Sequence, residues 1–177
     1  MRIIAGNLGG RIFRAPSGHR THPMSEKVRG AIFNALGDLS NLTVLDAFGG
    51  SGAIGFEAIS RGAKSVVIVE SSRTAQVSLR RNKKSLEIGQ ELTLINSPVG
   101  SWLKTTLEAR FNIVIADPPY DDRQLSNLQS LVGSVQANGI FVLSWPGAQS
   151  PPDFSPYQIV HQKDYGDAQL VFYKNVG

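Results

Sequence analysis

Short apolar runs alternate with amphipathic segments through most of the chain. The apolar runs predict strands at Thr43–Ala47, Ser65–Glu70, Leu92–Asn96, Phe111–Asp117 and Ile140–Ser144. Segments with helical spacing predict helices between them at Ala53–Ser60, Arg73–Leu86, Gly100–Leu107 and Arg123–Val135. Strands that are apolar throughout are typical of a parallel sheet with helices on both faces. The pattern therefore predicts an α/β fold with a mostly parallel sheet.

The end of the chain has a different pattern. After the Pro-rich stretch at residues 146–156, apolar segments predict strands at Gln158–Gln162 and Leu170–Tyr173. Only a turn at Asp164–Asp167 separates these two strands, with no room for a helix. We therefore expect them to pair antiparallel.

The first 40 residues precede the regular alternation. Arg2–Ala5 and Arg11–Arg14 predict a short hairpin, because Gly and Asn residues lie between them. Ser25 can cap a helix that runs to Leu36 and has apolar residues at Val28, Ile32, Phe33 and Leu36. We therefore divide the chain into an N-terminal extension at residues 1–40 and a main domain at residues 41–177.

The composition is that of one globular domain. Of the 177 residues, 41% are hydrophobic and none is Cys, which excludes disulfides, cysteine nucleophiles and thiolate metal sites. No apolar stretch has the length of a signal peptide core or a membrane span, so we expect a soluble cytoplasmic protein that does not bind membranes. His19, His22 and His161 lack metal-ligand spacing, and we expect no metal.

The excess positive charge is concentrated near the N-terminus. Residues 1–30 carry a net charge of +5, whereas the whole chain carries +4. Such a segment is typical of a surface that binds nucleic-acid phosphates, although a solvated tail explains the charge equally well. The candidate RNA-binding residues are Arg2, Arg11, Arg14, Arg20, Lys27 and Arg29.

A glycine-rich turn follows the first strand of the main domain. The turn begins after Asp46 and leads into a helix, so its backbone can approach a ligand closely. Gly50, Gly52 and Gly55 also fit a dinucleotide fingerprint, which makes the glycines alone unspecific. Asp46 distinguishes a dinucleotide site from an S-adenosylmethionine site. A carboxylate there would repel the pyrophosphate of a dinucleotide but attract the amine of S-adenosylmethionine. The candidate cofactor-binding residues of this turn are Asp46, Ala47, Phe48, Gly49, Gly50, Ser51 and Gly52.

An acidic residue also ends the second strand. Glu70 is placed where a nucleotide-binding fold has its ribose-binding acid, although it could also be a surface residue. Ser71 beside it, and Ser97 after the third strand, complete the candidate cofactor-binding set.

The fourth strand leads into Asp117-Pro118-Pro119-Tyr120. Asp117 and the carbonyl of Pro118 can accept the two hydrogens of an exocyclic amine, and Tyr120 can stack on the base that carries this amine. Pro-Pro is also common in rigid turns, so the tetrapeptide alone is only a moderate indication of a site. It becomes a strong indication together with Asp46 and Glu70. We name Asp117, Pro118, Pro119 and Tyr120 as candidate catalytic residues.

These residues resemble the class I S-adenosylmethionine-dependent methyltransferases, and among them the bacterial enzymes that methylate N2 of a guanine in 16S rRNA. The resemblance covers nearly the whole chain. Besides the three acidic strand ends, it rests on Arg2-Ile3-Ile4, Gly10-Arg11, Pro23–Arg29, Ala31–Asn34, Ser60–Ala63 and Tyr165–Asp167. One departure concerns Ser144, which stands where the family often has Glu.

The resemblance implies a fold, a reaction and a substrate. The fold would be the Rossmann-like class I methyltransferase fold, with a seven-stranded sheet, one antiparallel C-terminal strand and an N-terminal hairpin and helix. The enzyme would be a monomer that converts S-adenosylmethionine to S-adenosylhomocysteine. Its substrate would be guanine 966 of 16S rRNA in the small subunit or an assembly intermediate.

Three alternatives remain at the level of sequence. DNA adenine-N6 methylation uses the same kind of tetrapeptide, but the chain has no insertion for a DNA-recognition domain. A non-catalytic ribosome-assembly factor could bind RNA through residues 2–29, although it would have no need for Asp117–Tyr120. A nicotinamide dehydrogenase is disfavoured by Asp46.

Overall fold

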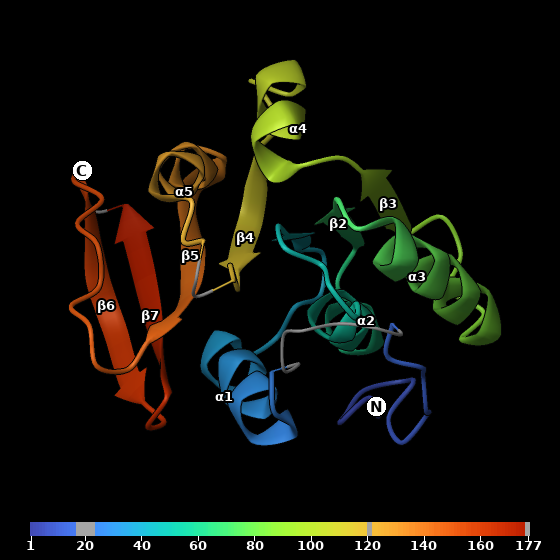
Figure 1. Ribbon diagram of the computed structural model, residues 1–177. Coiled ribbons are helices and arrows are strands. Elements are labelled where there is room, and N and C mark those ends of the chain that lie inside the picture. The colour runs from blue at the N-terminus through green and yellow to red at the C-terminus, as the bar shows by residue number, and fades with distance from the viewer. Residues whose placement is uncertain (17–23, 120–121, 176–177) are drawn as a thin grey trace.

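A seven-stranded sheet forms the centre of the computed structural model, which describes residues 1–16, 24–119 and 122–175. The strand order is β3-β2-β1-β4-β5-β7-β6 (Figure 1). Only β7 runs against its neighbours, since it pairs antiparallel with both β5 and β6. The strands are β1 Thr43–Asp46, β2 Ser65–Glu70, β3 Leu92–Asn96, β4 Phe111–Ala116, β5 Val135–Pro146, β6 Tyr157–Asp164 and β7 Ala168–Asn175. This topology confirms the predicted fold class.

Five helices cover the two faces of the sheet: α1 Glu26–Leu36, α2 Ala53–Ser60, α3 Arg73–Ser85, α4 Val99–Thr105 and α5 Leu125–Val132. Consecutive strand residues point to opposite faces, so Val44 packs with α1, α2 and α3 and Leu45 packs with α4 and α5. Both residues are fully buried. The continuous apolar runs in the sequence therefore arise because both faces of each central strand are covered.

The N-terminal segment packs against the same core as the main domain. Ile3 and Phe13 are buried, and the Phe13 ring contacts the Phe56 ring edge-on with centroids 5.3 Å apart. The Glu57 carboxylate of α2 accepts hydrogen bonds from the backbone N–H groups of Ile4, at 2.8 Å, and Ala5, at 3.1 Å. These contacts fix the extension on α2.

The structure moves several predicted element boundaries, most of all around β5, and it defines the N-terminal hairpin. The predicted N-terminal hairpin is confirmed as a short antiparallel pairing, in which Ile3 N donates to the Arg11 carbonyl and Phe13 N to the Met1 carbonyl, each at 3.0 Å, around a bridge between Arg2 and Ile12. Helix α5 ends at Val132 instead of Val135, and β5 begins at Val135 instead of Ile140. Asn138 adopts a positive φ of 63°, and the register between β4 and β5 shifts near this point. Most residues at this irregularity are not apolar. The apolar pattern therefore predicted only the part of β5 that begins at Ile140.

No helix in the described ranges has the length and hydropathy needed to cross a membrane.

Candidate active site

Three carboxylates gather at one edge of the sheet. Strands β2, β1 and β4 are adjacent and parallel, so their carboxyl ends lie together. Asp46 ends β1, Glu70 ends β2, and Asp117 follows β4 directly. Burial is the main cause that raises the pKa of Asp46, and the nearby carboxylates of Asp117 and Glu70 raise it further. The structure thus brings together the three acidic strand ends that the sequence singled out.

Asp46 is the most deeply placed of the three. Its side chain is 1% exposed, and one carboxylate oxygen accepts a hydrogen bond from Gly55 N at 3.1 Å. Burial raises its pKa to about 7, because the charged form loses its hydration. The hydrogen bonds from the backbone of Gly55 and Phe48 oppose this effect. A cationic ligand group beside this carboxylate would favour its ionised form.

Glu70 is held by the backbone on both sides. One carboxylate oxygen accepts from Gly50 N at 2.7 Å, and the other accepts from Ser72 N at 2.6 Å. The first bond joins the end of β2 to the glycine turn, and the second joins it to the start of α3. Each oxygen retains a further lone pair that could accept a hydrogen bond from a ligand hydroxyl.

The glycines of the turn have two different roles. A Cβ at Gly49 would lie 2.2 Å from the Ile68 side chain, and a Cβ at Gly52 would lie 2.5 Å from both Phe56 and Leu79. These two positions therefore require glycine for packing. Gly50 differs, because a Cβ there would meet only the Phe48 carbonyl at 3.8 Å. Its backbone borders open space, where a ligand could approach.

The remaining candidate cofactor residues lie around this turn. Ala47 is buried and its N–H donates to the Ile115 carbonyl, which joins β1 to β4. Phe48 and Ser51 are partly exposed, whereas Ser71 is exposed. Ser97 N donates to the Glu70 carbonyl at 3.1 Å, so the end of β3 also reaches the site.

Gln76 is a site-supporting residue that the sequence analysis missed. It is 1% exposed, and its amide Nε2 donates to the carbonyls of Glu70 and Ile95, each at 2.8 Å. This side chain therefore joins the ends of β2 and β3 from within α3. Its place beside Ala75 and Leu79 on the buried face of α3 was the available signal.

Asp117 leads a proline turn. The residue as a whole is partly exposed, and burial of its carboxyl by the surrounding protein raises its pKa. A hydrogen bond from the Ser144 hydroxyl of β5 opposes this shift. The Pro119 carbonyl accepts from Asp122 N at 3.1 Å, whereas no described residue donates to the Pro118 carbonyl. Tyr120, the fourth candidate catalytic residue, lies outside the described residues.

The basic candidates fall into different environments. Arg29 is wrong as an RNA contact, because its side chain is 1% exposed, faces Glu57 at 3.6 Å and donates to the Arg2 carbonyl at 2.6 Å. Arg2 is exposed and pairs with Glu26 at 2.8 Å. The exposed members also include Arg14 and Lys27, Arg11 is partly exposed, and Arg20 lies outside the described residues.

Comparisons with known proteins show which family the chain belongs to. A family model described as conserved hypothetical protein 95 matches residues 1–174. The chain is 29% identical over 184 residues to "Putative rRNA methyltransferase YlbH" of Bacillus subtilis (strain 168), and the alignment covers 100% of both proteins. It is 32% identical over 140 residues to "Ribosomal RNA small subunit methyltransferase D" of Escherichia coli (strain K12), covering 78% of this chain and 68% of that protein.

A solved structure extends the similarity to three dimensions. "Putative methyltransferase yhhF from Escherichia coli" matches with a TM-score of 0.86 and 27% sequence identity, covering 99% of this chain and 97% of that chain. The family model, the Bacillus subtilis relative and this solved structure each match nearly the whole chain. The protein therefore belongs to the conserved hypothetical protein 95 family, which here includes relatives named ribosomal RNA small subunit methyltransferase D.

Proposed function

We propose that the protein is an S-adenosylmethionine-dependent rRNA methyltransferase that methylates the exocyclic N2 of a guanine in 16S rRNA, at position 966. The observation that carries this proposal is the placement of three carboxylates and a glycine turn at the adjacent carboxyl ends of β1, β2 and β4. The names of the relatives support RNA of the small ribosomal subunit as the substrate. The choice of N2 and of position 966 rests on the resemblance in sequence.

The residues present fit S-adenosylmethionine better than a dinucleotide. A dinucleotide brings a pyrophosphate, which the negative charges of Asp46, Glu70 and Asp117 would repel. S-adenosylmethionine instead carries a sulfonium and an ammonium, and its ribose offers two hydroxyls. Asp46 is a buried acid that a cation would stabilise in its charged form. The ligand could approach the backbone of Gly50 closely, since a Cβ there would meet only the Phe48 carbonyl, at 3.8 Å.

Each group of residues then has a separate role. Asp46 and residues 49–52 would hold the methionine part of the cofactor, and Glu70 would hold the ribose hydroxyls. Ser71 and Ser97 would border the nucleoside. Because Gly50 N and Ser72 N fix the Glu70 carboxylate, its position is set before the ligand binds. No metal ion is needed in this scheme.

Asp117 and the proline turn would position the target amine. When bound, the cofactor supplies a methyl group activated by the positive sulfonium. The Asp117 carboxylate and the Pro118 carbonyl accept the two amine hydrogens, which directs the nitrogen lone pair toward the methyl carbon. Tyr120 stacks on the flipped base. Holding the amine in this position can lower the barrier by about 7–11 kcal/mol, because the reaction becomes effectively unimolecular.

The cofactor, when bound, would supply the methyl carbon to the amine nitrogen, and the electron pair of the carbon–sulfur bond would stay on its sulfur. The nitrogen then releases one proton, which Asp117 can accept or pass to water.

Partition of labelled methyl groups tests the proposal. The protein is incubated with labelled S-adenosylmethionine and either small ribosomal subunits that lack the modification, free 16S rRNA, or adenine-containing duplex DNA. We expect label in the RNA of the subunits or of an assembly intermediate. Label in DNA would overturn the substrate assignment, and RNA binding without label would indicate a non-catalytic assembly factor.

A further inference from the structure

Helix α3 carries a concentration of positive charge outside the N-terminal segment. Five of its thirteen residues are Lys or Arg, and none is Asp or Glu: Arg73, Arg80, Arg81, Lys83 and Lys84. The charge of the whole region after residue 30 is close to zero, so a sum over that region hides this helix. The structure shows where these charges lie.

Four of the five cations share the outer face of α3. Arg73, Arg80, Arg81 and Lys84 are exposed, and their spacing of seven, one and three residues places them along one side of the helix with Val77 between them. The opposite side is buried through Ala75, Gln76, Leu79 and Asn82. The exposed row extends about 16 Å from Arg73 to Lys84, at 1.5 Å per residue. We call Arg73, Arg80, Arg81 and Lys84 the α3 stripe.

The N-terminal segment joins this stripe. Arg14 is anchored to α3, because its N–H donates to Asn82 Oδ1 at 3.1 Å and its carbonyl accepts from Asn82 Nδ2 at 2.8 Å and Ser78 Oγ at 3.1 Å. Ser78 and Arg81 are three residues apart and therefore neighbours on the helix surface. The exposed Arg14 is thus held beside the α3 stripe, and the basic N-terminal segment continues into it.

The other end of the α3 stripe lies close to the candidate cofactor site. Arg73 directly follows Ser72, whose N–H donates to the Glu70 carboxylate. Helix α3 therefore starts beside the site and leads away from it (Figure 1), and the stripe lies along this helix. An RNA strand that presents a base to the site could follow this row with its phosphates.

Three members of the stripe are uncommitted within the described part of the chain. Arg73, Arg81 and Lys84 make no ion pair or side-chain hydrogen bond with any described residue, and Arg80 makes one long contact of 3.4 Å to Gln76. By contrast, Arg2 already pairs with Glu26, and Arg11 donates to the carbonyls of Ser85 and Leu86. The stripe cations thus retain more donors for phosphate than these N-terminal arginines.

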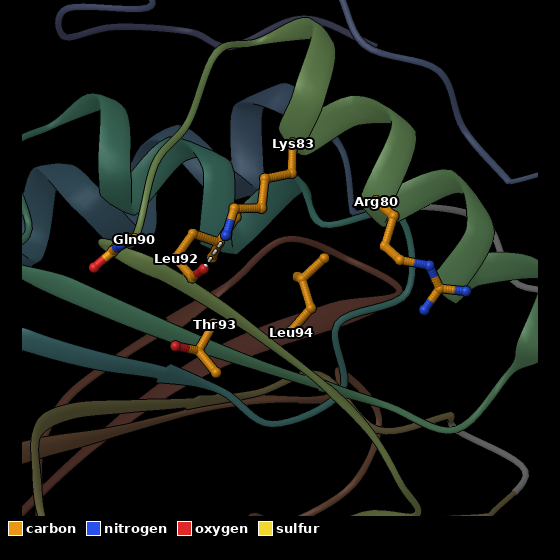
Figure 2. Close-up of a pocket in the computed structure, with 6 residues that line it drawn as sticks. All are labelled: Arg80, Lys83, Gln90, Leu92, Thr93 and Leu94. Carbon is orange, nitrogen blue, oxygen red and sulfur yellow. Dashed lines mark hydrogen bonds between the residues drawn. The ribbon is translucent and has the colours of Figure 1, made fainter.

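A hollow between α3 and the edge strand β3 adds polar groups beside the stripe. It is lined by Arg80, Lys83, Gln90, Leu92, Thr93 and Leu94. Figure 2 shows Arg80 and Lys83 extending from the helix, Leu94 of β3 pointing toward it and Thr93 pointing the other way, with Lys83 hydrogen-bonded to the Leu92 carbonyl. Arg80 and the exposed Gln90 supply donors and acceptors suited to the phosphates and 2′-hydroxyls of RNA.

We propose that the α3 stripe, together with Arg14, binds the sugar–phosphate backbone of the RNA substrate. This inference rests on the proposed function, because it extends the interface for the same substrate. A phosphate backbone matches a row of uncommitted cations by charge, and such contacts position RNA without reading its sequence.

The test compares two variants with the same change in charge. Arg81→Gln/Lys84→Gln removes two stripe cations, and Lys64→Gln/Lys104→Gln removes two exposed cations outside α3. Binding to a 16S rRNA transcript is measured between 50 and 300 mM KCl. Loss of two phosphate contacts should reduce the slope of log K against log salt by roughly 1.4–1.8 and weaken binding about threefold to tenfold near 0.1 M salt. The control should keep the wild-type slope.

The outcomes separate this proposal from the function itself. Equal slopes for the stripe variant and the wild type would overturn the proposal, even if the wild type methylates RNA. Failure of the wild type to bind S-adenosylmethionine or transfer methyl groups would refute the function, whatever the salt slopes. If the stripe variant loses binding to polyglutamate but not to RNA, the surface serves an acidic protein and the proposal is wrong.

Discussion

The carboxylate of Glu70 accepts a hydrogen bond from the backbone N–H of Gly50 at 2.7 Å. This bond ties the end of β2 to the glycine turn that follows β1. The other carboxylate oxygen of Glu70 accepts a hydrogen bond from Ser72 N at 2.6 Å, so a single side chain orders the turn and the start of α3. The residue proposed to bind the ribose thus also builds the loop around it.

Glu70→Gln should weaken S-adenosylmethionine binding by about tenfold to a hundredfold. A glutamine has only one acceptor oxygen, so its NH₂ group would face one of two backbone N–H donors. Titration calorimetry measures the affinity, and the exposed Glu108→Gln serves as the matched control. An unchanged affinity in Glu70→Gln would remove Glu70 from the cofactor site.

Asp117→Ala should abolish methyl transfer while leaving cofactor binding largely intact, because Asp117 is assigned to the target amine. Ser144→Ala removes the hydrogen bond to Asp117 and should reduce turnover more mildly, with the side chain less firmly positioned. Single-turnover transfer of labelled methyl, with calorimetry of S-adenosylmethionine on the same samples, separates the two steps. Retained turnover in Asp117→Ala would show that another group positions the amine.

Cofactor affinity should rise with pH between 5.5 and 7. Asp46 has a pKa raised to about 7 by burial, so much of it is protonated in the free protein over this range. A cationic ligand favours the ionised form, and binding must therefore expel the proton. The dissociation constant should fall by up to tenfold per pH unit and then level off above pH 7.

Calorimetry in buffers of different ionisation enthalpy detects this proton directly. Up to about 0.9 proton should be released on binding at pH 6, and no more than about 0.2 at pH 7.7, because a group with a pKa of about 7 is mostly ionised at the higher pH. Asp46→Asn should abolish the release. Binding at pH 6 without proton release would mean that Asp46 does not face a positive group of the cofactor.

The buried Glu57 should be essential for anchoring the N-terminal segment. Its carboxylate accepts from Ile4 N, Ala5 N and Arg61 Nε, and it faces the buried Arg29. Glu57→Ala would leave the Arg29 charge uncompensated, which typically costs about 3–5 kcal/mol in the free energy of unfolding. Denaturant unfolding measures this loss, and hydrogen exchange at Ile4 and Ala5 should accelerate.

A double variant distinguishes the buried charge from simple loss of packing. Arg29→Met/Glu57→Leu removes both charges, so it should be less destabilised than Glu57→Ala alone. If the double variant is as unstable as the single one, the backbone hydrogen bonds to Glu57 carry the stability instead.

The sequence predicted the sheet well because both faces of its central strands are buried. Val66 and Ile68 pack on one face of β2 and Val69 on the other, so the apolar run is uninterrupted. The acidic strand ends were equally visible, since Asp46, Glu70 and Asp117 each break such a run. Parallel order then placed them at one edge.

Side-chain partners were harder to predict from the sequence. The positive charge of Arg29 suggests an RNA contact, although its spacing from Ile32, Phe33 and Leu36 puts it on the buried face of α1. Its partner Glu57 lies 28 positions away, and such a pair depends on how α1 packs against α2. The α3 stripe was overlooked for another reason, because a net charge summed over a long region cannot show how charges are arranged on a helix.

Identification of the methylated nucleoside tests the central claim most directly. Small ribosomal subunits that lack the modification are incubated with the protein and labelled S-adenosylmethionine, and their RNA is digested to nucleosides. We predict that the label is recovered as N2-methylguanosine. Recovery of the label in any other nucleoside, or an absence of label with active substrate particles, would contradict the account.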